Sequence, residues 1–267
     1  MSAYRPRHLA PIADPSPGGA SRRSVLRGGA LGAAAVGVGT AALTAPAAQA
    51  APAGIHGQDV SGWQGEVDWA AQAALGSRFA YVKATEGRSY RSPAFNHQYR
   101  GAGDAGLVRG GYHFARPDSG GPAEQVDFFL DNGGGWSADG ITLPGMVDFE
   151  AYAGLPRDYG LNRQEMRDWI AGFSSRYREQ TGRRPVIYTN RSWWTDVVGE
   201  WTPKNSPLFL AAYRSQAPTV LPGRWWGWEL WQYSDSGPFA GDSALWYGSE
   251  EEFSRFVGEI DYGANSI

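Results

Sequence analysis

The stretch "GMVDFEAYAG", residues 145–154, decides the fold and carries the first functional signal. It begins with a short apolar run, typical of a buried strand, and it ends in small residues and a glycine, which stop a strand. Asp148 and Glu150 lie two positions apart at the end of the run. Residues i and i+2 of a strand point to the same side, roughly 6.5–7 Å apart. The two carboxyl groups are therefore expected to face one cleft.

Similar short runs of apolar, β-branched or aromatic residues recur along the chain and predict further buried strands. Between the early runs lie amphipathic stretches, two of them with proline at the first turn, which predict helices. After residue 185 the runs come close together and leave little room for helices. The predicted strands are 55–63, 79–87, 108–115, 145–150, 185–190, 207–213 and 228–234, with an eighth near 244–248, and the predicted helices are 67–75, 92–106, 122–132 and 162–182.

The order of these elements is β-α repeated four or five times, followed by β-β-β. This order predicts an α/β fold, a modified TIM-like (β/α) barrel with eight strands and fewer helices. In a parallel barrel the carboxyl ends of all strands open on one face, where barrel enzymes build their sites. Polar or aromatic residues stand at these ends: Asp59, Glu86, Tyr112, Asp148, Glu150, Tyr188, Tyr213, Trp231 and Gln232, with Asp242 before the last strand.

Several acids on one rim repel one another, so their convergence favours a function over a solvated surface. A second negative charge and partial burial raise the pKa of a carboxyl, which can then donate a proton near neutral pH. Paired acids of this kind suit glycoside hydrolysis. The alternative is a Ca²⁺ or Mg²⁺ site built from Asp59, Asp148, Glu150 and Asp242. The 12 Trp and 13 Tyr, whose rings can stack on sugars, and the absence of a phosphate loop favour the glycosidase, with no metal and no cofactor.

The first 50 residues read as an export signal and not as part of the fold. Arg22 and Arg23 precede a weakly apolar stretch to about Leu43, and Ala48-Gln49-Ala50 is a small-x-small cleavage signature. The stretch is short of the roughly 20 apolar residues of a membrane span. We expect a removable twin-arginine signal over 1–50, export from a bacterium, no stable membrane anchor, and one secreted catalytic domain over 51–267.

Composition excludes several classes of function. The first 50 residues contain five arginines and one aspartate, so the remaining residues carry a net charge near −7, against −3 for the whole chain. Such a charge argues against a nucleic-acid partner. Cysteine is absent, so neither disulfides nor thiolate metal sites support the fold. No G-x-S-x-G elbow and no H-x-x-x-H pair is present, which argues against a serine hydrolase and a zinc peptidase. His113 is expected in the core or behind the site.

The segments "DVSGWQGEVDW", "YVKATEG", "GGYHFARP", "VDFE", "IYTN" and "LWQYS" occur in this order. Together they resemble glycoside hydrolase family 25, the Chalaropsis-type lysozymes, over about residues 55–257. The resemblance implies a modified barrel that cleaves the β-1,4 bond between N-acetylmuramic acid and N-acetylglucosamine in peptidoglycan. It also implies a role for each acid and for the cleft aromatics: Glu150 as general acid, Asp148 as its charged partner, Asp59 and Glu86 as matching acids, and Tyr112, Tyr188, Tyr213 and Trp231 as cleft lining.

At Asp242 the chain departs from the family's pattern, since "GDSALWYG" stands where Asp-Leu-Asn is common. The spacing of the acid pair does not by itself decide between inversion and retention. Our hypothesis is a retaining route in which the substrate's 2-acetamido group is the nucleophile. Two alternatives to the muramidase stay open, a glycosidase acting on chitin-like substrates and a non-catalytic peptidoglycan-binding protein. A monomer is expected.

Overall fold

The computed structural model describes residues 52–260. The predicted signal segment and its cleavage site lie outside the described residues. Within 52–260, no helix combines the length and the apolar character needed to cross a membrane.

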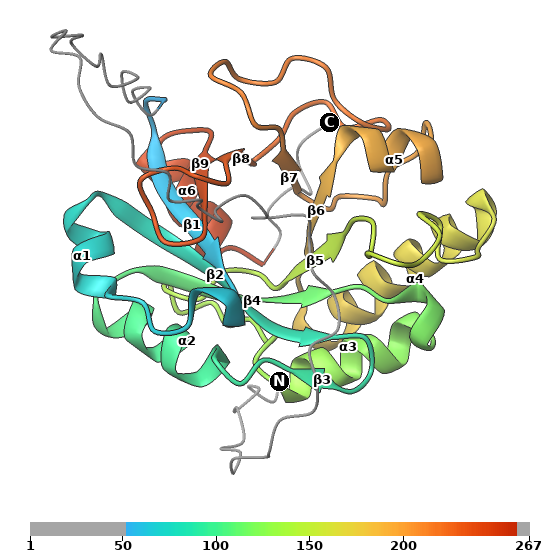
Figure 1. The fold of residues 1–267 in the computed structure, drawn as a ribbon, viewed down its shortest axis with the longest axis horizontal. Helices are drawn as coiled ribbons and strands as arrows, with labels where there is room; N and C mark the ends of the chain where they lie inside the picture. Colours follow the sequence, from blue (N-terminus) through green and yellow to red (C-terminus); the bar gives the residue numbers. More distant parts are fainter. Residues whose placement is uncertain (1–51, 261–267) are drawn as a thin grey trace, which may run out of the picture.

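Eight strands form a closed barrel (Figure 1), as the sequence predicts. Each strand pairs with its neighbours in the order β1-β9-β8-β7-β6-β5-β4-β2, and β1 also pairs with β2, which closes the ring. A two-residue strand, β3 (Tyr90–Arg91), extends the sheet beside β2. The barrel strands are β1 (Ile55–Val60), β2 (Ser77–Glu86), β4 (Val108–Phe114), β5 (Met146–Phe149), β6 (Val186–Asn190), β7 (Leu208–Ala211), β8 (Leu230–Ser234) and β9 (Asp242–Trp246).

The barrel is mixed and not wholly parallel, which corrects the prediction for its last strand. β9 runs antiparallel to both β1 and β8, whereas the other barrel pairs are parallel. The connection from β8 to β9 is too short for a crossover helix, so the chain turns back directly. As a result the first residue of β9, Asp242, lies on the rim formed by the carboxyl ends of the parallel strands.

Helices pack around the outside of the barrel from β2 to β6 (Figure 1). The four predicted helices are present as α1 (Trp69–Ala74), α2 (Phe95–Asp104), α3 (Pro122–Asp131) and α4 (Arg163–Thr181). The longest, α4, begins with a capping box between Asn162 and Glu165 and ends at Gly182 in the left-handed conformation. Two helices were missed, α5 (Arg191–Val197) and α6 (Glu250–Gly258), together with the short 3₁₀ turns η1 (Gly62–Gln64) and η2 (Pro117–Ser119).

Aromatic residues of a long connection cover the outer side of β7, β8 and β9. The connection, residues 212–229, carries Trp228 and Trp225, which pack on Leu210 and Trp231. A helix is not needed on this side because the indole rings bury the sheet. The tryptophan-rich composition thus has a structural cause, since Trp193, Trp194, Trp231 and Trp246 are all at most 1 % exposed.

The lower half of the barrel is filled with large apolar side chains, and α6 closes its base. Phe253 and Phe256 of α6 pack against Phe79 and Trp246 inside the barrel. The buried Arg183 donates to the carbonyls of Phe256 and Glu259 at the end of α6. Within residues 52–260 the base of the barrel is therefore filled with packed side chains.

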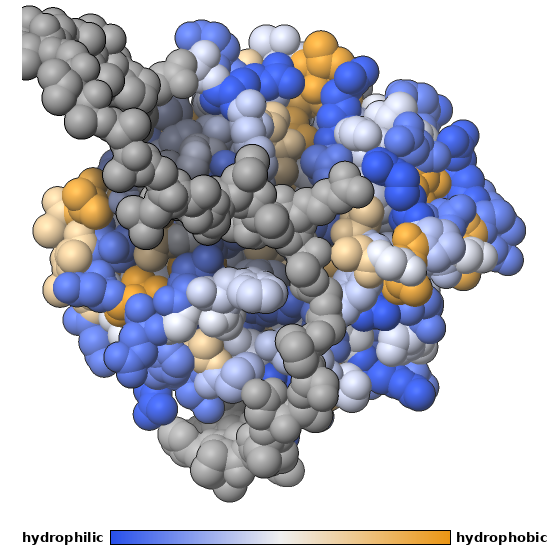
Figure 2. Space-filling model, in the orientation of Figure 1, coloured by the Kyte–Doolittle hydropathy of each residue, from blue (hydrophilic) through white to orange (hydrophobic). Residues whose placement is uncertain are grey.

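The molecular face seen in Figure 2 is largely hydrophilic, and its hydrophobic residues form small separate groups.

One partly buried acid at the base should make the stability of the fold depend on pH. Glu229 precedes β8, and its Oε2 accepts from the main-chain N–H of Leu208 at 2.8 Å. Burial raises the pKa of the Glu229 carboxyl to about 7. Between its ordinary pKa and about 7 the folded protein holds this proton and the unfolded chain has lost it, so the free energy of unfolding falls as pH rises through that window.

We expect Glu229→Gln to leave the free energy of unfolding unchanged near pH 4 and to raise it by about 3 kcal/mol at pH 8. The amide keeps an acceptor for Leu208 and has no charge to bury. Urea unfolding of both proteins between pH 4 and 8 measures the difference. A difference that does not grow with pH would contradict the assignment.

Candidate active site

A cavity of about 490 Å³ opens at the carboxyl ends of the parallel strands. Side chains along each strand point alternately into the barrel and out of it, and this alternation determines which residues line the cavity. The inward-pointing side chains are apolar near the base and mostly polar near the carboxyl ends of the parallel strands. The cavity brings together most of the predicted residues: Asp59, Glu86, Tyr112, Asp148, Glu150, Tyr188 and Asp242.

Two of the acids stand directly opposite each other. Asp59 near the end of β1 and Asp242 at the start of β9 are partners in the antiparallel ladder. Side chains at such opposed positions have Cβ atoms about 4.5–5.5 Å apart, and like charges there are destabilising. Both residues are at most 9 % exposed. The short return of β9 therefore places Asp242 in the site, where the sequence signal was weakest.

The other acid pair comes from β5. Asp148 is in register with Phe114 of β4 and Tyr188 of β6, and it is 6 % exposed. Glu150 lies one residue beyond the end of β5 and is more exposed than Asp148. The pair thus combines a deeply buried carboxyl with one at the mouth of the cavity, both on the same side of the strand.

Gln232 connects several of the predicted residues through hydrogen bonds. Its amide nitrogen donates to Asp59 Oδ2 at 2.6 Å. Its amide oxygen accepts from Tyr188 at 2.8 Å and from Tyr213 at 2.9 Å. Gln232 therefore fixes one carboxylate and two phenol rings, and it brings Tyr213, which is 48 % exposed, to the edge of the cleft.

Trp231 does not lie in the cleft, and we correct its assignment as a cleft residue. It is 1 % exposed, packs among the outer aromatic residues, and donates its indole N–H to the carbonyl of Ala212 at 2.7 Å. Adjacent strand residues point to opposite faces, so the inward position of Gln232 requires Trp231 to face outward.

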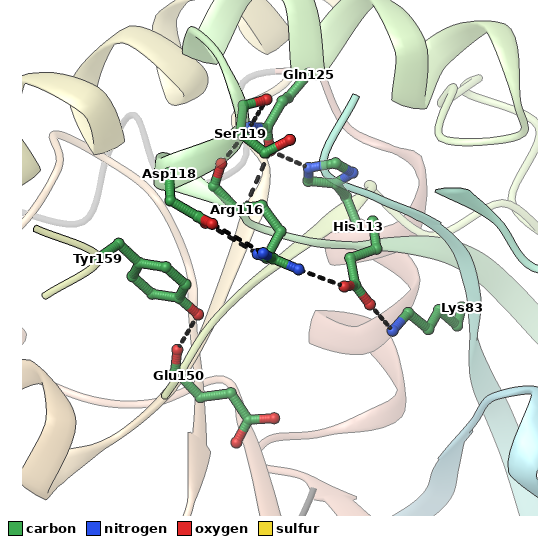
Figure 3. A network of polar contacts seen from close by, with 9 residues as sticks. Lys83, His113, Arg116, Asp118, Ser119, Gln125, Glu150 and Tyr159 are labelled. Carbon is green, nitrogen blue, oxygen red and sulfur yellow. Dashed lines mark hydrogen bonds and ion pairs between the residues drawn. The ribbon is translucent and has the colours of Figure 1, made fainter. Parts of the chain in front are cut away.

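Glu86 lies between two cations on one wall of the cleft. Figure 3 labels both cations, Lys83 and Arg116. Its carboxylate contacts Lys83 Nζ at 2.7 Å and Arg116 at 3.0 Å. Arg116 also forms a bidentate pair with Asp118, whose hydrogen bonds and charge raise the pKa of Arg116. The guanidinium lies 3.9 Å from the ring centre of Tyr152, two residues beyond Glu150. This arrangement fixes the wall and neutralises Glu86, so the remaining acids dominate the charge of the cleft.

His113 supports this wall from behind. It is fully buried, one ring nitrogen lies 2.8 Å from Thr85 Oγ1, and the other lies 2.9 Å from the amide oxygen of Gln125. Gln125 in turn contacts the main chain of Arg116 at both its N–H and its carbonyl. Burial lowers the pKa of His113 to about 4, so the ring is neutral at physiological pH. This confirms the expectation that His113 lies behind the site.

Four residues of this region were missed in the site prediction. Trp63, which is 75 % exposed, and Tyr152 line the cavity as aromatic surfaces. Arg116 packs on the ring of Tyr152, and Tyr159 donates a hydrogen bond to the carbonyl of Glu150. Trp63 stands three residues beyond the first strand, so its place in "DVSGW" could have indicated the cleft. Arg116 and Tyr159 gave no such signal, because their positions depend on how loops fold over the rim.

Two acid pairs, tyrosine rings and an open groove suit the binding and protonation of a sugar polymer. Among residues 52–260, no group of three or more His, Cys, Asp or Glu side chains is arranged to hold a metal ion.

The sequence pattern described as "Glycosyl hydrolases family 25" matches residues 58–242 of the chain. The protein belongs to this family. The matched range begins one residue before Asp59 and ends at Asp242, so it spans both acid pairs of the cleft. This glycosyl hydrolase family 25 member is therefore a glycoside hydrolase, as the resemblance implied.

Relatives agree over nearly their whole length. An N,O-diacetylmuramidase of Arthroderma benhamiae is 46 % identical over 228 residues, which cover 82 % of this chain and 96 % of that one. The solved family 25 lysozyme of Aspergillus fumigatus is 42 % identical, with a TM-score of 0.75, over 77 % of this chain and all of that one. The bacterial lysozyme of Streptomyces coelicolor is 40 % identical, with a TM-score of 0.75, over 78 % of this chain and 99 % of that one.

Proposed function

We propose that this family 25 glycoside hydrolase is a lysozyme that cleaves the β-1,4 bond after N-acetylmuramic acid in peptidoglycan, with Glu150 as the proton donor. The observation that carries the assignment is the placement of Asp148 and Glu150 on one side of β5, opposite the Asp59 and Asp242 pair. Relatives named as a muramidase and as lysozymes cover 77 % to 82 % of this chain. Peptidoglycan glycan strands are then the partner of the cleft.

The roles of the acids follow from their depth. Glu150 stands at the mouth of the cavity, where the oxygen of the leaving sugar can reach it, and we assign it the proton donation. Asp148 is buried beside it and stays close to the reacting carbon, where a negative charge stabilises the oxocarbenium-like transition state. Asp59 and Asp242, on the far wall, add to the negative potential, and Gln232 orients Asp59.

We favour a retaining route in which the substrate supplies the nucleophile. Glu150 protonates the glycosidic oxygen, the bond from that oxygen to C1 breaks, and the 2-acetamido oxygen of the muramic acid bonds to C1. Asp148 balances the positive charge that develops on the acetamido nitrogen. Water then attacks C1 and gives its proton to the Glu150 carboxylate, and the acetamido group is released. Two inversions at C1 retain the β configuration.

The anomer formed first distinguishes this route from inversion. Digestion of glycan strands in the NMR tube should give the β-anomer of the new reducing end before it equilibrates. An α-anomer as first product would overturn the retaining route and would leave the substrate assignment intact.

The substrate assignment is tested on purified cell walls. Loss of turbidity should accompany fragments whose new reducing ends, after borohydride reduction, are muramitol by mass spectrometry. Release of reducing ends from chitin oligomers but not from walls would indicate the chitin-like alternative. Retention on walls with no fragments would indicate a non-catalytic wall-binding protein.

We further propose that the enzyme is exported from a bacterium by a twin-arginine signal over residues 1–50 and acts outside the cell as a monomer of residues 51–267. The Arg22-Arg23 pair and the Ala48-Gln49-Ala50 cleavage signature support the export. N-terminal sequencing of the secreted protein should begin at Ala51, and light scattering should give the mass of one chain. Material retained in the cell with residues 1–50 intact would contradict it.

A further inference from the structure

We infer that Tyr159 is a positioning residue for Glu150, acting with Thr189 to fix the main chain on both sides of the acid. The inference rests on the proposed role of Glu150 and extends it, because it explains how a residue beyond the end of its strand is held still.

Glu150 needs such support because the sheet does not supply it. β5 ends at Phe149, and its last register partner is Thr189 of β6. Outside the ladder, two side-chain hydroxyls bond the carbonyls that flank the acid. Thr189 Oγ1 donates to the carbonyl of Phe149 at 2.8 Å. Tyr159 Oη donates to the carbonyl of Glu150 at 2.6 Å (Figure 3). Both peptide planes that determine where the Glu150 side chain points are therefore held by hydroxyl groups.

Tyr159 adopts an uncommon backbone conformation to make this contact. Its φ is +56°, and among the non-glycine residues of 52–260 only Asn205 shares a positive φ. Asparagine tolerates that region, whereas a bulky side chain there is a strained outlier. Such strain persists only where surrounding contacts hold it, and it gathers at functional sites.

The surroundings of Tyr159 do hold it in place. Its ring is 6 % exposed and belongs to the core between β5, α4 and α5. Its N–H donates to the carbonyl of Pro156 at 3.0 Å, and the indole of Trp193 donates to the carbonyl of Arg157 at 2.8 Å. The loop therefore presents the phenol at a fixed point.

The phenol also keeps its proton. Burial, and after it the nearby charges of Asp148 and Glu150, raise the pKa of Tyr159 above its ordinary value. The hydroxyl remains a donor over the pH range in which a general acid can work, so the contact is not lost as pH rises.

The test is Tyr159→Phe, with Tyr81→Phe as matched control. Tyr81 also donates to a main-chain carbonyl, that of Pro144 at 2.9 Å, but it lies in the apolar core and does not line the cavity. Both variants lose one buried hydrogen bond and keep the ring, so similar drops in Tm are expected. Tyr159→Phe should lower kcat on glycan strands about 10- to 100-fold with KM within twofold, since a displacement of about 1 Å costs up to 10²-fold. Tyr81→Phe should leave kcat unchanged.

Two further measurements separate positioning from a general loss of structure. The alkaline limb of the kcat profile should move to lower pH in Tyr159→Phe, because a loosened Glu150 is better solvated and gives up its proton more readily. In a Glu150→Gln background, Tyr159→Phe should change the residual rate less than twofold, because its effect passes through the acid.

The outcomes distinguish this inference from the proposed function. If Glu150→Gln keeps full activity, the proposed function fails. If Glu150→Gln is inactive but Tyr159→Phe matches Tyr81→Phe in kcat and pH profile, the positioning role alone is overturned. If Tyr159→Phe lowers the rate by the same factor in the wild-type and Glu150→Gln backgrounds, the positioning role is overturned as well.

Discussion

Glu150→Gln lowers the rate of peptidoglycan cleavage by about 10²–10⁴-fold, the range that general acid catalysis supplies. The amide has nearly the same size and cannot give up a proton to the leaving oxygen. The hydrogen bonds of Tyr159 to the carbonyl of Glu150 and of Thr189 to the carbonyl of Phe149 involve main-chain acceptors and are unaffected by the change. Initial rates of turbidity loss, with circular dichroism and Tm to confirm the fold, measure the effect.

The control for this variant is Glu66→Gln, the same change at an exposed position outside the cleft lining. It should clear walls at the wild-type rate. Clearing by Glu150→Gln at the same rate as Glu66→Gln would mean that the end of β5 is not the catalytic centre.

Asp148→Asn should lose activity and gain stability. Removal of the charge beside the reacting carbon is expected to lower the rate about 10²–10³-fold, as for other preorganised electrostatic contacts. The same change removes repulsion from Glu150, Asp59 and Asp242 at a residue that is 6 % exposed, so Tm at pH 7 should rise by about 2 °C. Wall-clearing rates and calorimetry on one preparation test both parts.

A loss of activity together with a lower Tm would show that Asp148 serves the fold, and our account of the acid pair would need revision. Glu150→Gln provides the comparison, because Glu150 is more exposed and its neutralisation should shift Tm less.

The sequence predicted the barrel because strand signals are local. Alternating apolar runs and the polar residues that end them are visible in a single stretch such as 145–154. Parity within a strand then predicts that Asp148 and Glu150 share a side, and the structure places both in the cavity. The same alternation shows why the prediction for Trp231 was wrong, since its neighbour Gln232 points into the barrel and Trp231 must point outward.

What the sequence did not reveal depends on long-range geometry. The reversal of β9, which brings Asp242 opposite Asp59, follows from a short connection whose direction no local pattern specifies. α5 is only seven residues long and begins directly after Asn190, the last residue of β6, so it lacked a separate signal. Tyr159 reaches Glu150 through a turn with positive φ that a tyrosine would not be expected to adopt.

Ion pairs and hydrogen bonds also link other residues of the rim. Arg116, Glu86 and Lys83 form a fixed wall, and Gln232 holds Asp59 and two tyrosines. A sugar polymer that enters the groove meets preformed contacts, and little reorganisation is required as charge develops on the substrate.

The central claim, proton donation by Glu150, is tested most directly by changing the leaving group. A synthetic disaccharide with 2,4-dinitrophenolate at C1 of its muramic acid needs no acid for departure, and dinitrophenolate release reports the first step. Our account predicts that Glu150→Gln remains within about tenfold of wild type on this substrate and is about 10²–10⁴-fold slower on glycan strands. An equal loss on both substrates would contradict it, because Glu150 would then serve some role other than protonating the leaving oxygen.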